Sequence, residues 1–165
     1  PCGTLFPYTT LFRSVGDRLI LFPTNELIVA DQLLHTVKPF DLEESKPFYK
    51  YLAGILGSGL IAFFFRKRFN RTEKTFPEIR VAELKSLPIR PIDFDNPDDV
   101  AKHDKMVTLV ERMLDLHKQK AGEGNPNTLK QLKTQITATD HLIDRLVYEL
   151  YELTDDEIAL VEQSG

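Results

Sequence analysis

The residues with the clearest chemical potential form one basic cluster. They are Arg66, Lys67, Arg68, Asn70, Arg71 and Lys74. Lysine and arginine neutralise the phosphates of a nucleic-acid backbone, and arginine and asparagine also make paired hydrogen bonds to guanine and adenine edges. The cluster therefore predicts a DNA-binding site. The alternative interpretation is that these cations complement the negative end of a helix dipole.

Residues that support metal chemistry do not occur at the required spacing. The four histidines (His35, His103, His117 and His141) never form an i, i+4 pair with a carboxylate partner, so we expect no metal site. Glu83-Leu84-Lys85 has the local form of a nuclease Glu-x-Lys pair. No Pro-Asp precedes it at a suitable distance, and a surface turn explains it better.

Catalytic and cofactor motifs are also missing from the sequence. There is no glycine-rich loop after a strand for a nucleotide or S-adenosylmethionine, and no Asn-Pro-Pro-Tyr segment for adenine methylation. The only cysteine, Cys2, cannot form a disulfide within the chain, which fits a reducing, cytoplasmic setting. We expect this chain alone to be non-catalytic and to bind no cofactor.

The first 14 residues are expected to be non-native. Thr4–Ser14 reads TLFPYTTLFRS, which is the translation of a common sequencing adapter, and the chain starts at Pro1 rather than at methionine. Such a segment is excluded before the fold is considered. The alternative interpretation is a natural strand-turn-strand rich in threonine, phenylalanine and leucine. The chain is therefore expected to be a fragment whose credible part begins at Val15.

The formal charge of −4 hides an asymmetry. Residues 1–90 carry 13 Lys+Arg against 9 Asp+Glu, whereas residues 91–165 carry 8 against 16. This difference suggests a DNA-facing part joined to an acidic part with another role, although acidic surface also keeps a domain soluble.

The elements that position the basic cluster are expected to be short strands and one buried helix. Two apolar runs, 17–22 and 26–30, predict strands separated by the turn residues 23–25. A helix is expected from Phe48 to about Arg66, where Lys50 is the only internal charge. Its glycines, Gly54, Gly57 and Gly59, predict a close approach by another backbone on one face. A membrane span is the alternative, but the uncharged run 51–65 is shorter than the roughly 20 residues that a bilayer requires.

The compact part is expected to end near residue 90. The segment 76–89 predicts a strand around Ile79 and a helical turn at 82–86, followed by Pro88, Pro91 and Pro97. Because the residue before each proline is pushed out of the helical region, extended chain should follow. We therefore expect a recognition-domain remnant at 15–90 and a helical part at 91–165.

Residues 91–165 predict two long amphipathic helices and a short third one. The first helix, about 98–120, is expected to start at Asp98 or Asp99, and the second covers about 128–151. Their apolar seams are Val100, His103, Val107, Val110, Leu114 and His117, and Leu129, Leu132, Ile136, Thr139, Ile143, Leu146 and Leu150. The turn-rich connector 121–127 predicts an antiparallel hairpin. Thr154-Asp-Asp-Glu157 is a capping box for a last helix that ends near Glu162. The expected fold class is α+β, with short strands around a buried helix before the hairpin.

The order of these segments resembles a known family. A Tyr-Leu-x-x-Ile-Leu-x-Ser-x-Leu-Ile-x-Phe-Phe helix at 51–64, FPEIRVAELKSLPI at 76–89 and IDRLVYELYELTDDEIALVE at 143–162 are similar to the C-terminal target-recognition part of Eco57I-like and TaqI-like restriction-modification proteins. The family usually carries glycine after the tyrosine of the last segment, whereas this chain has Glu152.

The resemblance implies a recognition module whose parent methylates adenine N6. That parent would use S-adenosylmethionine and could also cleave DNA with a divalent metal such as Mg²⁺. The expected partners are double-stranded DNA and the methyltransferase domain of the same parent chain, with no membrane. The alternative is a protein-interaction adaptor that binds partners through the helical hairpin.

Overall fold

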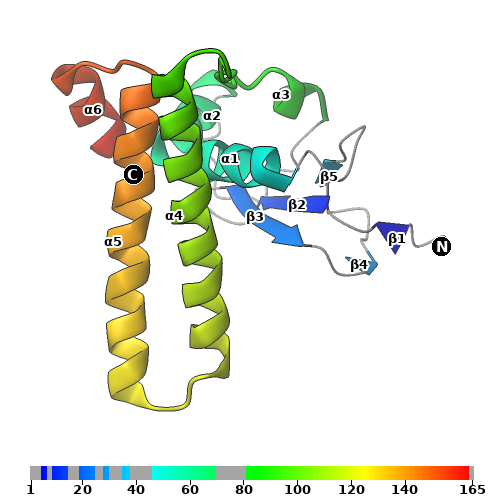
Figure 1. Cartoon of the computed structure of the whole chain (residues 1–165), viewed down its shortest axis with the longest axis vertical. Helices are drawn as coiled ribbons and strands as arrows, with labels where there is room; N and C mark the ends of the chain where they lie inside the picture. Colours follow the sequence, from blue (N-terminus) through cyan, green and yellow to red (C-terminus); the bar gives the residue numbers. More distant parts are fainter. Residues whose placement is uncertain are drawn as a thin grey trace.

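The computed structural model describes residues 46–69 and 81–163, together with five short strands among residues 5–37 (Figure 1). The strands are β1 Leu5–Phe6, β2 Thr9–Ser14, β3 Leu19–Thr24, β4 Ile28–Val29 and β5 His35–Val37. β2 pairs antiparallel with both β3 and β5, and β1 pairs antiparallel with β4. The six helices are α1 Lys46–Gly57, α2 Gly59–Arg68, α3 Val81–Lys85, α4 Pro97–Gly122, α5 Pro126–Leu150 and α6 Asp155–Glu162.

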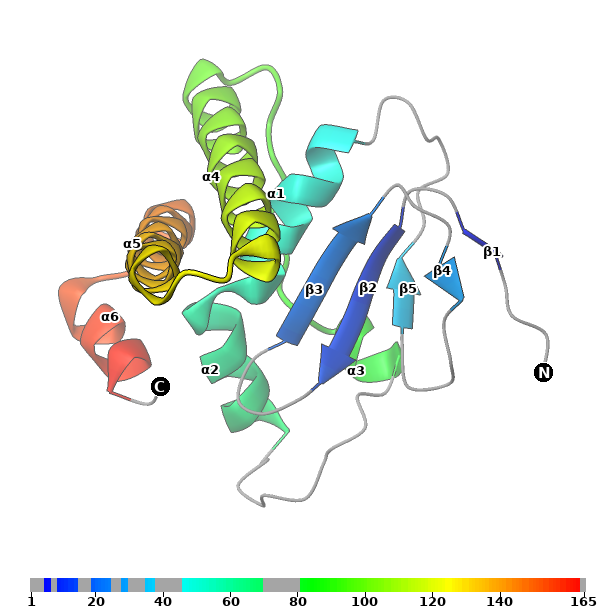
Figure 2. The same cartoon turned by 90° about the horizontal axis from the view of Figure 1, so that it is seen from below.

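The predicted α+β class, with short strands around a buried helix, is wrong for the continuous part of the structure. Residues 46–69 and 81–163 are about 80% helical and contain no strand. The described core side chains that pack around α1 come from α2, α4 and α5, whose apolar surfaces cover this buried helix. The strands lie to one side of α1, with β3 in contact with it (Figure 2). The strand expected around Ile79 lies outside the described residues.

The single buried helix predicted from Phe48 to Arg66 is two helices. α1 ends at Gly57, α2 begins at Gly59, and their axes differ by 58°. Ser58 causes the break: its extended backbone and its side chain, which accepts from the Ile61 amide, form an N-cap for α2. The two flanking glycines are poor helix formers and make the break less costly.

At Gly54 the helix is approached closely by side chains of α4, whereas the prediction was a close approach by another backbone. A Cβ atom built there would lie 2.3 Å from Sδ of Met106 and 3.2 Å from Cγ2 of Val110. Both residues belong to α4, and Met106 is fully buried. Only glycine therefore leaves room for α4 to pack this closely on α1.

No single helix among the described residues is long and apolar enough to cross a membrane. The bent pair formed by α1 and α2 meets that requirement only when its two parts are counted together, on length and composition. In this structure Tyr51, Ile55 and Ile61 of the pair are almost completely buried within the protein.

The hairpin is slightly longer than predicted, because α4 starts earlier and ends later than expected, at Pro97 and Gly122, and α5 starts earlier, at Pro126. Asn96 caps α4 by accepting a hydrogen bond from the Asp98 amide at 3.0 Å, and Pro97 occupies the first turn. Asn125 and Pro126 repeat this arrangement at the start of α5. Proline is tolerated at the first helical position because its missing N–H has no partner there. The predicted cap at Asp98 or Asp99 is therefore wrong.

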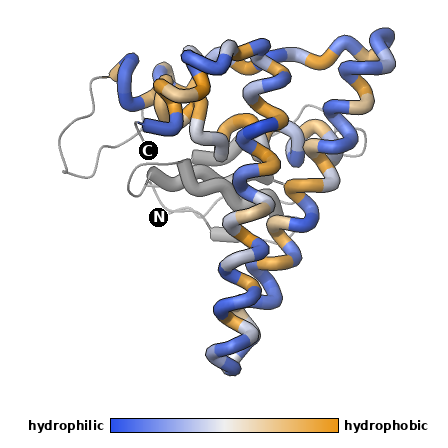
Figure 3. The backbone as a smooth tube through the Cα atoms, turned by 90° about the vertical axis from the view of Figure 1, so that its left-hand side faces the viewer, coloured by the Kyte–Doolittle hydropathy of each residue, from blue (hydrophilic) through white to orange (hydrophobic). Residues whose placement is uncertain are grey.

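The seam of α5 follows the prediction more closely than that of α4. On α5, Leu132, Thr139, Ile143, Leu146 and Leu150 are buried as expected, and apolar and polar positions alternate along the hairpin (Figure 3). On α4, the buried residues are Asp99, His103, Met106, Leu109, Val110 and Leu116, whereas the predicted His117 is exposed. The difference arises because α4 packs against α1 as well as α5.

The C-terminal helix α6 has the predicted capping box. The Thr154 side chain accepts from the Glu157 amide, and the Glu157 carboxylate accepts from the Thr154 amide at 2.8 Å. Of the two residues expected to dock, Val161 is buried and Ile158 is partly buried. α6 packs against α2.

Candidate nucleic-acid interface

The exposed end of α2 carries the described part of the predicted DNA-binding cluster. Arg66, Lys67 and Arg68 form its last turn. Lys67 and Arg68 are exposed and Arg66 is half-buried. The ammonium of Lys67 lies 5.8 Å from the ring centroid of Phe63, one turn earlier, which is a cation–π distance. Three of the six predicted residues therefore share one surface.

The other three predicted residues (Asn70, Arg71 and Lys74) lie outside the described residues. The alternative interpretation of the cluster, complementation of the helix dipole, also fits the geometry because all three described cations occupy the last turn of α2. The two interpretations are compatible, since a cation that stabilises a helix end remains available to a phosphate when it is exposed.

The direction of α2 is set at its other end by a carboxylate from α5. Oδ1 of Asp144, a buried residue, accepts a hydrogen bond of 2.7 Å from the Gly59 amide, and the Ser58 hydroxyl donates to the Ile55 carbonyl at 2.7 Å. A negative charge at a helix N-terminus is favourable because it satisfies a free N–H and complements the dipole. These contacts fix α2 beside α6 (Figure 2).

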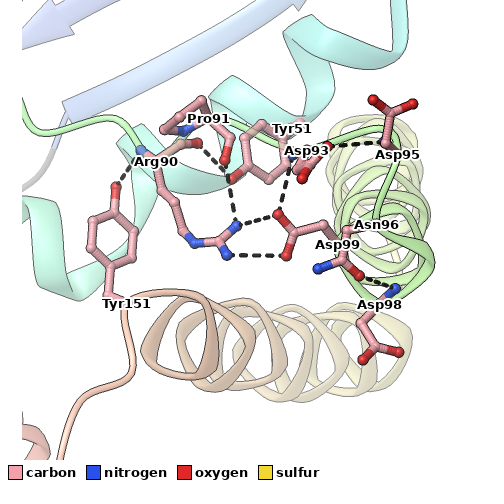
Figure 4. A network of polar contacts seen from close by, with 9 residues as sticks. All are labelled: Tyr51, Arg90, Pro91, Asp93, Asp95, Asn96, Asp98, Asp99 and Tyr151. Atoms are coloured by element: carbon pink, nitrogen blue, oxygen red, sulfur yellow. Dashed lines mark hydrogen bonds and ion pairs between the residues drawn. The ribbon is translucent and has the colours of Figure 1, made fainter.

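A second polar cluster joins the segment after α3 to three helices (Figure 4). The guanidinium of Arg90 binds the carboxylate of Asp99 through two hydrogen bonds of 3.0 Å, and Asp99 also accepts from the Asp93 amide at 3.1 Å. The Tyr51 hydroxyl donates to the Arg90 carbonyl at 2.9 Å. The Tyr151 hydroxyl donates to the Pro88 carbonyl and accepts from the Arg90 amide at 3.2 Å. The arrangement holds the extended chain between α1, α4 and α5.

The electrostatics of this cluster favour the ion pair and keep the tyrosines neutral. The hydrogen bonds from Arg90 hold the pKa of the Asp99 carboxyl below its ordinary value, and the same contact raises the pKa of Arg90. Burial raises the pKa of Tyr51 to about 12 and also raises the pKa of Tyr151. These groups therefore keep their charge state at neutral pH, which suits a structural role rather than proton transfer.

The described histidines differ in their surroundings. His103 is buried, as its packing role predicted, with its ring 5.5 Å from those of Tyr51 and Phe94 and its Nδ1 2.9 Å from Asp104. His117 and His141 are exposed. Among the described residues, no group of three His, Cys, Asp or Glu side chains has the geometry to hold a metal ion.

The Glu83–Lys85 pair lies on the single-turn helix α3, where Lys85 is exposed and Glu83 half-buried. Ser86 and Leu87 close this turn through hydrogen bonds to the Glu83 and Leu84 carbonyls. The geometry is that of the predicted surface turn.

An exposed group of cations on a helix end is a feature of nucleic-acid-binding proteins. Residues 9–89, just under half of the chain, match the family model of the TaqI-like C-terminal specificity domain. The match indicates a DNA-recognition domain of a restriction-modification enzyme in this part of the chain, and α1, α2 and α3 lie inside it. No curated protein matches the chain significantly, and no solved structure does. Because the match begins at residue 9, within the expected adapter translation, the adapter origin of residues 1–14 stays a prediction.

Sequence reasoning missed the residues that hold α2 and the segment after α3 in place. The hydrogen-bond partners of these side chains are distant in the sequence: they lie 85 residues away for Asp144, 9 for Asp99 and 39 for Tyr51. No local sequence pattern therefore predicts these contacts. A weak signal was available for Asp144, because a carboxylate next to Ile143 on an apolar seam needs a partner when it is buried.

Proposed function

We propose that the chain is the target-recognition part of a site-specific DNA methyltransferase that modifies adenine at N6, with or without an endonuclease in the same protein. The observation that carries this proposal is the match of residues 9–89 to a specificity domain. The exposed cations of α2 lie within the matched segment and support DNA contact.

The division of labour within the parent protein follows from the same reasoning. A specificity domain reads the target, while the methyltransferase domain would bind S-adenosylmethionine, and a nuclease, if present, would bind Mg²⁺. The hairpin of α4 and α5 would then set the distance between recognition and catalysis, in a cytoplasmic protein. At 1.5 Å per residue, the 26 residues of α4 give a rod of about 39 Å.

The experiment is a salt titration of duplex binding by the whole chain. Each phosphate contact contributes about −0.9 to the slope of log K against log salt. Replacing Arg66, Lys67 and Arg68 by alanine should reduce that slope by about 2 to 3 if all three contact phosphates. The matched control replaces Lys105, Arg112 and Lys118, three exposed cations of α4, and should leave the slope unchanged.

Sequence recognition is tested separately by selecting bound duplexes from a random pool. A recurring motif among the selected duplexes is the expected result. Salt-independent or undetectable duplex binding by the whole chain would contradict the proposal and favour a protein-interaction adaptor.

A further inference from the structure

The outward face of α5 carries a polar and basic stripe that the proposed function does not use. From Asn127 to Arg145, the exposed positions at the helical spacing of three and four residues contain no carboxylate, and the stripe ends before the exposed Glu149. These positions are Asn127, Lys130, Thr134, Thr137, His141 and Arg145. Lys133, also exposed, lies beside the stripe. The distance from Lys130 to Arg145 along the helix is about 22 Å.

The exposed face of α4 has a mixed character instead. Asp104, Glu111 and Asp115 are exposed there, and so are the cations Lys105, Arg112 and Lys118. Glu111 forms an ion pair with Lys50 of α1. The two helices of the hairpin therefore differ, because only α5 has a long exposed stretch that carries cations without carboxylates.

The cations of the α5 stripe, Lys130, Lys133 and Arg145, form no ion pair within the described part of the chain. Lys130 and Lys133 are also three residues apart on one helix, a spacing at which like charges destabilise the helix. The arrangement is better explained by an external anionic partner.

We propose that the α5 stripe binds the sugar-phosphate backbone of duplex DNA, as a second contact separate from α2. Lysine and arginine neutralise phosphates, and the Asn127 amide and the Thr137 hydroxyl on the same stripe can donate further hydrogen bonds to phosphate oxygens, whereas the Thr134 hydroxyl donates to the Lys130 carbonyl. The three cations are spread over about 22 Å of the helix, so each can approach a different phosphate of the duplex. Lys130 and Lys133 lie near the turn of the hairpin, at the opposite end of the molecule from α2 and α6 (Figure 1).

This inference rests on the proposed function, because it assigns the hairpin a contact with the same duplex. It changes the role of the hairpin from a spacer to an arm that extends the footprint. Such contacts add affinity and fix orientation without reading bases.

The test compares two triple variants of the whole chain on duplex DNA. Lys130, Lys133 and Arg145 are replaced by alanine in one, and Lys105, Arg112 and Lys118 in the other, so that both lose two lysines and one arginine from exposed positions. Alanine favours helix, so both variants should keep the wild-type circular dichroism and melting temperature. In the α5 variant the salt slope should fall by about 2 to 3 and the protected stretch of DNA should be shorter. In the α4 variant the salt slope and the length of protected DNA should equal those of the wild type.

Three results would overturn the proposal. Equal losses of salt slope in the two variants would show that the slope depends on net charge alone and not on the α5 stripe. If the wild type binds duplex DNA in a salt-dependent way and the α5 variant has the same salt slope, the stripe does not contact DNA. The proposed function would be unaffected by that result. A stripe that serves an acidic protein segment would instead show weaker binding to polyglutamate with unchanged duplex binding. Absence of wild-type duplex binding would contradict the proposed function itself.

Discussion

The backbone amide of Gly59 donates a 2.7 Å hydrogen bond to Oδ1 of Asp144, 85 residues later in the chain. This contact joins the first turn of α2 to α5. The carboxylate therefore holds the helix that carries Arg66, Lys67 and Arg68 in its orientation.

Replacing Asp144 by alanine should cost about 1–3 kcal/mol, because a partly buried amide at a helix start loses its acceptor. Asp144→Asn should cost less, since the amide oxygen can still accept the hydrogen bond. Urea denaturation measures the difference in unfolding free energy, and hydrogen exchange reports on the Gly59 amide. Unchanged exchange at Gly59 in the alanine variant would show that this contact does not protect the start of α2.

The Arg90–Asp99 pair should make stability depend on pH in the acid range. Because the pKa of Asp99 is lowered in the folded state, the stabilisation is present above the ordinary value of 3.8 and is lost as the pH falls through the folded value. Arg90→Ala should therefore lower the melting temperature at neutral pH, and its difference from the wild type should shrink below pH 3.8. Arg90→Lys should be intermediate because an ammonium cannot form the two parallel hydrogen bonds.

A melting-temperature series across pH for wild type and both variants provides the measurement. A difference in melting temperature between wild type and Arg90→Ala that stays constant down to strongly acidic pH would contradict the assigned role of Asp99.

Glu152→Gly should stabilise the protein. Glu152 has a φ of 54°, in the left-handed region, and follows the C-cap of α5, where the Leu153 amide donates to the Tyr148 carbonyl at 3.1 Å. This is the Schellman arrangement, in which glycine is the favoured residue. Relief of the Cβ clash is worth about 1 kcal/mol, or roughly 2–4 °C in melting temperature for a protein of this size.

Glu152→Ala is the control for that variant because it removes the carboxylate but keeps Cβ. It should leave the melting temperature close to that of the wild type. An equal rise in the alanine and glycine variants would point to charge rather than to backbone strain.

The sequence predicted the elements of 91–163 well because their signals are local. The capping box at Thr154 and the seam of α5 depend on residues within a few turns of each other. The Asn96-Pro97 and Asn125-Pro126 pairs are equally local start signals, and attention to them would have placed both helix starts correctly. Thus the hairpin could be predicted from helical periodicity and turn composition.

The parts that were predicted wrongly depend on contacts between distant segments. The break at Ser58 is stabilised partly by Asp144, and the burial of Met106 follows from the space left by Gly54. A helical wheel of α4 cannot show that two neighbours share its surface. For the candidate interface, composition identified the cations of α2, whereas their orientation depends on tertiary contacts that no local pattern contains.

The Arg90 cluster also limits the positions at which this domain can be joined to a different hairpin. The family match ends at residue 89, yet Pro88 and Arg90 are held by Tyr51 of α1, Asp99 of α4 and Tyr151, the C-cap residue of α5. A graft made at residue 89 would leave Tyr51 on one side and its partners on the other. Exchange of the hairpin between related recognition modules therefore requires that both partners of all four contacts are transferred together. The segment to be exchanged as a unit is thus larger than the matched residues 9–89.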